Sequence, residues 1–133
     1  MKFLITGGAG FIGSHLVDLL VAKKNVTEVK VIDNLEDGSL KNLKNALKNK
    51  KVNFFKKDIR NFSGIQSIFK SVDTVIHLAA LSDVVPSITE PKVYMENNIN
   101  GTLNILEAMR ENKVNKIVYA ASSSCYGIAK NFP

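Results

Sequence analysis

Four glycines lie within residues 7–13, directly after a short apolar segment at residues 2–6. Glycine loses more backbone entropy on folding than any other residue, so this cluster indicates that something requires bare backbone there. Gly8, Gly10 and Gly13 form a G-x-G-x-x-G string. The string follows a predicted strand and opens a predicted helix, the setting in which glycines let a pyrophosphate approach the backbone and the helix N-terminus. A purely structural glycine turn is the alternative.

Short apolar segments alternate with helical patterns along the rest of the chain. The predicted strands are 2–6, 29–33, 52–55, 73–80 and 116–124, and the predicted helices lie at 12–24, around Leu40, Leu43 and Leu47, around Ile65, Ile68 and Phe69, and after Pro91. This alternation predicts an α/β fold, a Rossmann-type doubly wound parallel sheet of about five strands with right-handed crossovers. A length of 133 residues suits one domain, so residues 1–133 are taken as one unit.

An acidic residue ends the second predicted strand. Asp33 lies 20 residues after Gly13, which is the spacing at which a carboxylate accepts hydrogen bonds from an adenosine ribose. Because a carboxylate there would repel a 2′-phosphate, NAD is favoured over NADP. A helix-capping or turn aspartate is the alternative, but two features that agree on one geometry indicate a dinucleotide site.

Other strand ends carry further candidates. Asp58, after the third strand, could accept from an adenine amino group or simply begin a turn, and sequence alone leaves both open. The small residues of 77–81 would let a ligand lie across the strand ends, where open parallel sheets bind ligands. His77 fits a packed histidine satisfied by a neighbour better than a catalyst, and His15 carries no functional prediction.

Composition narrows the partners and the compartment. The net charge is +6, largely from lysines at 41–57 that we interpret as a solvated surface, because no aromatic residues interleave as in single-strand binders. We therefore expect no nucleic-acid partner. We also expect no membrane partner, since no apolar run approaches the ~20 residues that span a bilayer. We expect no metal site. A single cysteine fits a reducing compartment, so we expect a cytoplasmic protein.

Six segments together resemble one family. "TGGAGFIGSH", "VIDNL", "KDIRN", "HLAAL", "NNINGTLNILEA" and "YAASSSCYG" are similar, in order and spacing, to the extended short-chain dehydrogenase/reductases. The likeness covers almost the whole chain. Within that superfamily it resembles the NAD-dependent nucleotide-sugar 4-epimerases, including those that act on UDP-N-acetylhexosamines. The resemblance implies oxidation and re-reduction at carbon 4 of a UDP-sugar, NAD as cofactor, and a homodimer for the full-length form.

The resemblance also implies roles for individual residues. It places Ser122 as the catalytic Ser/Thr, with Ser123 and Ser124 facing the sugar. Dehydratases of the superfamily usually carry an Asp-Glu pair in place of these last two serines, so dehydration is disfavoured. The implied cofactor-binding residues are Gly7, Gly10, Phe11, Ile12 and Gly13 for the pyrophosphate, Asp33 and Asn34 for the ribose, Asp58 and Ile59 for the adenine, and Leu78, Ala79, Ala80 and Asn97 along the cofactor.

The family's catalytic tyrosine and lysine have no good match. Tyr126 and Lys130 form a literal Tyr-x-x-x-Lys string, but Tyr126 belongs to the "YG" that relatives carry besides their catalytic tyrosine and lies too near Ser122. We therefore expect an N-terminal piece that lacks the substrate domain, with a truncated sheet whose uncovered edge favours self-association or weak stability. A non-catalytic NAD-binding module or sensor, or another nucleotide-sugar dehydratase or reductase, stays open as an alternative.

Overall fold

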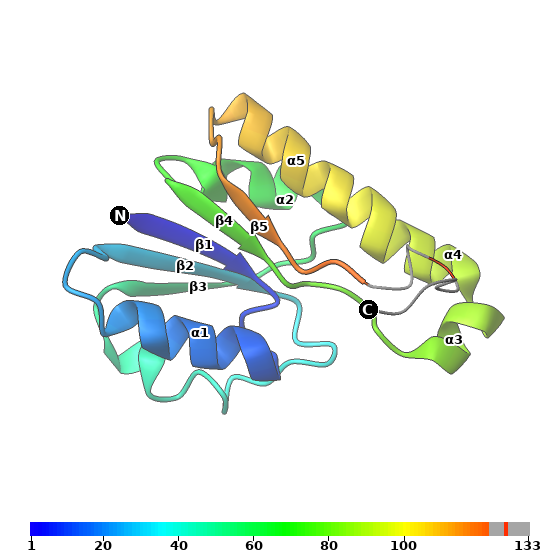
Figure 1. Ribbon diagram of the computed structural model, residues 1–133, viewed down its shortest axis with the longest axis horizontal. Helices are drawn as coiled ribbons and strands as arrows, with labels where there is room; N and C mark the ends of the chain where they lie inside the picture. The colour runs from blue at the N-terminus through cyan, green and yellow to red at the C-terminus, as the bar shows by residue number, and fades with distance from the viewer. Residues whose placement is uncertain (123–126, 128–133) are drawn as a thin grey trace, which may run out of the picture.

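Five parallel strands form the centre of the computed structural model, which describes residues 1–122 and 127 (Figure 1). They are β1 (Lys2–Thr6), β2 (Glu28–Asp33), β3 (Val52–Lys56), β4 (Thr74–His77) and β5 (Ile117–Tyr119). Their order across the sheet is β3-β2-β1-β4-β5, so the chain winds outward from β1 in one direction and then from β4 in the other. The predicted Rossmann-type α/β fold is confirmed, and its topological switch point lies between β1 and β4.

Helices cover both faces of the sheet (Figure 1). One face carries α1 (Phe11–Val21) and the short 3₁₀-helix η1 (Ala46–Lys48). The other carries α2 (Phe62–Ile65), η2 (Gln66–Phe69) and α5 (Gly101–Glu111). After β4, α3 (Val84–Thr89) leads into α4 (Pro91–Tyr94), the π-helical turn η3 (Met95–Asn100) and α5, which continue one another as the predicted long helix after Pro91.

Alternation along the strands divides the buried apolar side chains into two cores. Leu4 joins the core under α2 and α5, together with Phe69 and Ile105, whereas Ile5 joins the core under α1 with Val17. Successive strand residues point to opposite faces, so a strand covered on both sides needs apolar residues in a continuous run. The continuous apolar strands predicted from the sequence therefore reflect burial on both faces.

The prediction of a regular helix around Leu40, Leu43 and Leu47 is wrong. Most backbone hydrogen bonds within residues 39–49 instead run to the residue three back, such as Leu43 N to Leu40 O at 3.1 Å, and only Ala46–Lys48 is a regular 3₁₀-helix. Leu43 is fully buried, but Leu40 and Leu47 are exposed. Asparagine side chains compete for backbone groups, and Asn42 Nδ2 donates to Ala9 O at 2.8 Å, which ties this segment to the glycine loop instead of to a helix.

The fourth and fifth strands are shorter than predicted because their partners end first. β4 pairs with β1 as far as His77, where β1 ends at Thr6 and turns into the glycine loop. Residues 78–81 therefore leave the sheet and become part of a cleft. β5 ends at Tyr119 for the same reason, opposite His77. Within the described residues β5 is an edge strand, and its three side chains are all exposed. This agrees with the uncovered sheet edge expected from the sequence.

His77 is buried at the end of β4 between two threonines, as the packed interpretation predicted. Its Nδ1 lies 2.6 Å from Thr6 Oγ1 and its Nε2 lies 2.9 Å from Thr102 Oγ1. Because the Thr102 hydroxyl donates to Asn98 O, its oxygen accepts from Nε2–H, and Nδ1 then accepts from the Thr6 hydroxyl. This arrangement needs a neutral ring, and burial lowers the pKa of His77 to about 4.

We predict that His77 makes the fold sensitive to mild acid. The unfolded chain takes up a proton near pH 6.5 and the folded chain only near pH 4, so stability is full above the unfolded pKa and is lost as the pH falls between these values. From about pH 7.5 to about pH 5 the free energy of unfolding should fall by about 2 kcal/mol through this group. Urea denaturation at the two pH values measures it.

The chain's second histidine supplies the control for this experiment. His15 is on the exposed side of α1, so His15→Gln makes the same substitution without removing the buried ring, whereas His77→Gln should reduce the pH dependence of the wild type. An equal pH dependence in the wild type and His77→Gln would contradict the assignment of a neutral buried ring.

Candidate functional site

The glycine loop between β1 and α1 packs against neighbouring backbone. Gly7 has φ of +69°, and a Cβ there would lie 2.8 Å from Ala79 N. A Cβ on Gly13 would lie 2.6 Å from the Cα of Gly8 and closer still to Gly7 O. These two positions therefore require glycine, the first for its left-handed backbone and the second so that α1 can approach the loop.

The N-terminus of α1 is open to an anion. Gly10 is its N-cap residue, no side chain caps the helix, and its first turn contains no acidic residue. The amides of a first helical turn have no partner within the helix, and they sit at the positive end of its dipole. Phe11 and Ile12 offer these amides, while their side chains are 79% and 68% exposed. The loop and helix end thus form a suitable cradle for a phosphate group.

Asp33 joins the end of β2 to the glycine loop. One carboxylate oxygen accepts from Ala9 N at 2.9 Å and the other from Leu35 N at 2.8 Å. Only 7% of the residue is exposed. Each carboxylate oxygen has a second lone pair, so the side chain can hold the loop and still accept from a ligand hydroxyl.

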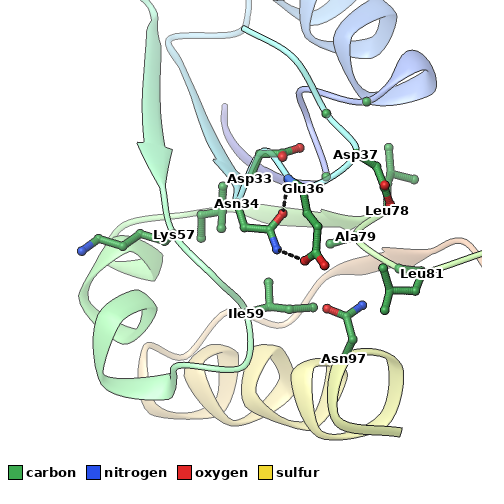
Figure 2. Close-up of a pocket in the computed structure, with 15 residues that line it drawn as sticks. Asp33, Asn34, Glu36, Asp37, Lys57, Ile59, Leu78, Ala79, Leu81 and Asn97 are labelled. Carbon is green, nitrogen blue, oxygen red and sulfur yellow. Dashed lines mark hydrogen bonds between the residues drawn. The ribbon is translucent and has the colours of Figure 1, made fainter. Parts of the chain in front are cut away.

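A cleft of about 120 Å³ opens where the carboxyl ends of β1, β2 and β4 meet (Figure 2). Its wall combines the glycine loop, the loops after β2 and β3, the segment after β4 and the start of the long helix. Nine of the residues predicted for cofactor binding line it: Gly7, Gly10, Asp33, Asn34, Ile59, Leu78, Ala79, Ala80 and Asn97.

Four other predicted residues lie beside this cleft instead of lining it. Gly13, Phe11 and Ile12 belong to α1, where the first supports the loop and the others offer backbone amides. Asp58 lies between two lining residues, Lys57 and Ile59, but is not itself in the wall.

Sequence reasoning missed several residues of the wall, and all of them except Ile32, which lies within β2, belong to segments between elements whose path no periodicity predicts. The "NLEDGS" turn after Asp33 was the available signal for those in the loop after β2. The missed residues are Ile32, Glu36, Asp37, Gly38, Lys57 and Leu81.

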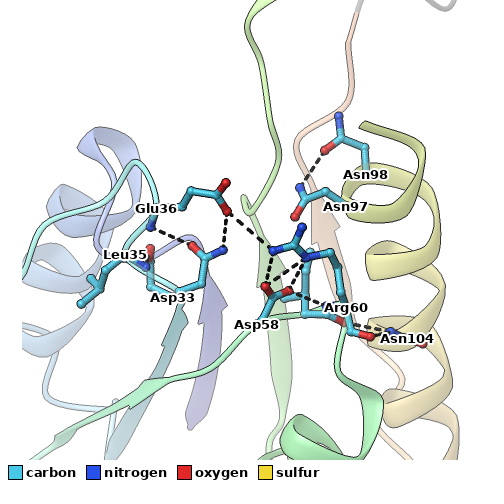
Figure 3. Close-up of polar contacts among 10 residues, drawn as sticks. Asp33, Leu35, Glu36, Asp58, Arg60, Asn97, Asn98 and Asn104 are labelled. Carbon is cyan, nitrogen blue, oxygen red and sulfur yellow. Dashed lines mark hydrogen bonds and ion pairs between the residues drawn. The ribbon is translucent and has the colours of Figure 1, made fainter. Parts of the chain in front are cut away.

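A polar network joins the loops after β2 and β3 at one side of the cleft (Figure 3). The Arg60 guanidinium donates to both carboxylate oxygens of Asp58, with its Nη2 at 2.5 Å and its Nε at 3.0 Å. It also lies 3.7 Å from Glu36, which accepts from Asn34 Nδ2 at 3.0 Å. The arginine lowers the pKa of Asp58 below its usual value, mainly through their hydrogen bonds, and hydrogen bonding to Asp58 raises the pKa of Arg60.

The segment after β4 is attached to the long helix at its π-helical turn. Asn98 accepts from Leu81 N and donates to Leu81 O, both at 2.9 Å. Asn97, which is 6% exposed, donates to Asn98 Oδ1 at 2.9 Å and lines the cleft. Short π-helical turns widen a helix by one residue and often occur at functional sites. Here the turn presents two consecutive asparagines toward the cleft and its neighbouring segment.

A second cavity, of about 640 Å³, shares the segment Leu78–Leu81 with the first. Tyr94, Thr102 and Tyr119 line it, and so does Ser122, the predicted catalytic residue. Ser123 and Ser124, predicted to face a sugar, and Tyr126 and Lys130 lie outside the described residues. The two cavities share this segment as a common wall and follow the carboxyl ends of the strands from β2 to β5, and we call the pair the path.

The path suits an elongated ligand with an anionic middle. A helix N-terminus and bare backbone lie beside it, a carboxylate with spare lone pairs lies at one end, and a hydroxyl-bearing residue lies at the other. A dinucleotide has this order of groups: a diol and base, a diphosphate, and a second nucleoside. In residues 1–122 no helix is both long and apolar enough to cross a membrane.

Comparisons with known proteins agree with this geometry. The family model described as GDP-mannose 4,6 dehydratase matches residues 4–133. UDP-glucose 4-epimerase of Halalkalibacterium halodurans is 41% identical over 135 residues, which cover all of this chain and 38% of that protein. The chain thus spans about two fifths of the length of such curated relatives.

Solved structures show the same relationship. The structure of Thermus thermophilus UDP-glucose 4-epimerase in complex with NAD is 41% identical, with a TM-score of 0.81, and covers 92% of this chain and 38% of that one. A dTDP-glucose 4,6-dehydratase from Streptomyces venezuelae, solved with NAD bound, is 34% identical, with a TM-score of 0.92, and covers 99% of this chain and 42% of that one. With a family model that matches nearly its whole length, the chain belongs to the GDP-mannose 4,6 dehydratase family of NAD-dependent epimerases and dehydratases.

Proposed function

We propose that this chain is the NAD-binding part of a nucleotide-sugar 4-epimerase that acts on a UDP-sugar. The observation that carries the proposal is the meeting of the glycine loop, the α1 N-terminus and Asp33 around one cleft at the switch point of the sheet. Open α/β sheets bind ligands at this place. The 4-epimerase reaction is favoured because curated relatives at 41–42% identity are named UDP-glucose 4-epimerases and because Ser123 and Ser124 stand where dehydratases of the superfamily usually carry an Asp-Glu pair.

Each part of the cleft has a proposed partner in NAD. The pyrophosphate accepts from the glycine loop and the α1 amides, the adenosine ribose donates to Asp33, and the adenine lies near Ile59 with its amino group toward Asp58. The remaining wall follows the cofactor toward the second cavity. The proposed binding residues are Gly7, Gly10, Phe11, Ile12, Gly13, Asp33, Asn34, Asp58, Ile59, Leu78, Ala79, Ala80 and Asn97.

The second cavity is the proposed place of reaction. When bound, NAD supplies a hydride acceptor and donor for carbon 4 of the sugar. Ser122 lines this cavity and, in the proposal, hydrogen-bonds the reacting oxygen, while Ser123 and Ser124 face the sugar. The base that removes the hydroxyl proton belongs to a part of the protein beyond this chain, because the string at Tyr126 lies too close in sequence to Ser122. For the whole protein we propose a homodimer.

Isothermal titration calorimetry with NAD and NADP tests the proposal. We expect saturable binding of one NAD per chain and weaker binding of NADP, because the Asp33 carboxylate at 7% exposure would face the added phosphate. A chain that folds cooperatively but binds neither dinucleotide would overturn the proposed function.

Two glycine substitutions separate binding from folding. A Cβ on Gly10 meets only Gly7 O, at 3.3 Å, so Gly10→Val should fold but hold the diphosphate away from the loop. Loss of one hydrogen bond to a charged group weakens binding by at least about tenfold. Gly13→Ala, by contrast, forces backbone apart and should lower the free energy of unfolding by about 1–3 kcal/mol. Calorimetry and urea denaturation of both variants measure the two effects.

Epimerase activity should differ between this chain and a protein expressed from a longer reading frame. The 133-residue chain supplied with NAD and UDP-glucose or UDP-N-acetylglucosamine should give no 4-epimer, since it lacks a suitably placed base. A reading frame that continues into a Tyr-x-x-x-Lys should give it. Coupled assay of the product sugar measures both, and epimerisation by this chain alone would assign the base to Tyr126.

A further inference from the structure

Acidic side chains are concentrated at the adenosine end of the cleft. Asp33, Glu36 and Asp37 all belong to the wall, and Lys57 is the one cationic residue among those that line it. The chain as a whole has a net charge of +6, so this local excess of negative charge runs against its composition. A ligand at this end therefore lies close to three carboxylates and one ammonium group of the wall.

Glu36 is held in place over the cleft. Its carboxylate accepts from Asn34 Nδ2 at 3.0 Å, and its own amide donates to Asn34 Oδ1 at 3.0 Å. Figure 2 shows the side chain extending from the loop after β2 toward the centre of the cleft. Half of the side chain, 52%, is exposed, so it faces both the cleft and solvent.

Arg60 lies close to Glu36, and its guanidinium is surrounded by carboxylates. Both oxygens of Asp58 accept from its guanidinium, Glu36 lies 3.7 Å away, and the charge of Glu96 also acts on it. Proteins that bind NADP use an arginine near the ribose to accommodate the 2′-phosphate. In this chain such an arginine is present beside the loop that follows Asp33, but acidic neighbours compensate its charge (Figure 3).

We propose that Glu36 is a second residue that determines cofactor specificity, and that it rejects a 2′-phosphate in two ways. The proposal rests on the dinucleotide site proposed above. The Glu36 carboxylate repels the phosphate, which carries about −1.5 to −2 charge at neutral pH. It also lies 3.7 Å from the Arg60 guanidinium and adds a second negative charge to that of Asp58, so that the charge of the arginine is compensated before a phosphate arrives. Asp33 alone therefore does not account for the preference for NAD.

The test is the ratio of the Kd for NADP to the Kd for NAD, measured by calorimetry. Glu36→Gln should lower this ratio by roughly five- to tenfold, because it removes one repulsion at a partly exposed site and leaves Arg60 compensated by Asp58 alone. Adding Arg60→Gln to Glu36→Gln should restore part of the ratio. Glu28→Gln makes the same charge change at the opposite end of β2, where Glu28 faces Lys2, and should leave the ratio unchanged.

The salt dependence of this ratio in the wild type is a second measurement. Raising the salt concentration from about 50 mM to about 500 mM shortens the screening length severalfold, so the ratio in the wild type should fall. A ratio that stays the same in Glu36→Gln, or that falls as much in Glu28→Gln, would overturn the role of Glu36. A fall that is equally large when Arg60→Gln is added would overturn the role of the arginine. If the wild type binds no NAD, the proposed function itself fails, and the two failures are thereby distinguished.

Discussion

Pairing of β1 with both its neighbours is the constraint on which the site depends. Thr6, the last residue of β1, lies opposite Ile32 on one side and His77 on the other. All three strands consequently end at the same level, and the chain leaves each of them at one edge of the sheet. The glycine loop, the Asp33 loop and the Leu78–Leu81 segment meet at this edge because the strand register brings the three strand ends together. A shift of one residue would move every core side chain to the wrong face, so the cores that hold the register also hold the site.

Polar groups at this edge serve the fold and the proposed ligand at once. Asp33 satisfies amides of two loops, and Thr6 Oγ1 links His77 to the amides of Leu78 and Ala79 at 3.3 Å. These side chains position backbone that would otherwise be irregular and mobile. The consequence is a cleft that is largely formed before any ligand arrives, which lowers the entropy lost on binding.

The sequence predicted what periodicity and glycine chemistry encode. The five strands, the burial of β1, β2 and β4 on both faces and the glycine loop follow from apolar runs and from backbone that tolerates no Cβ, as at Gly7 and Gly13. It did not predict the form of residues 39–49, because Asn42 and the Ala9 carbonyl form a contact between distant segments that no local pattern reveals. The same reason hid Glu36 and Arg60, whose importance depends on two loops meeting across the ends of β2 and β3.

The two cavities differ in how completely the described residues enclose them. The first cleft, which is the proposed adenosine end, has walls from the loops after β1, β2, β3 and β4. Its polar groups form hydrogen bonds with one another and keep acceptors for a ligand. The second cavity is larger and borders β5, whose side chains are exposed at 36%, 59% and 53%. Exposed apolar residues on an edge strand gain stability when further protein covers them. Under the proposed function, dinucleotide recognition therefore depends on contacts made within the described residues, whereas the cavity proposed for the reaction borders a strand that gains stability from further cover.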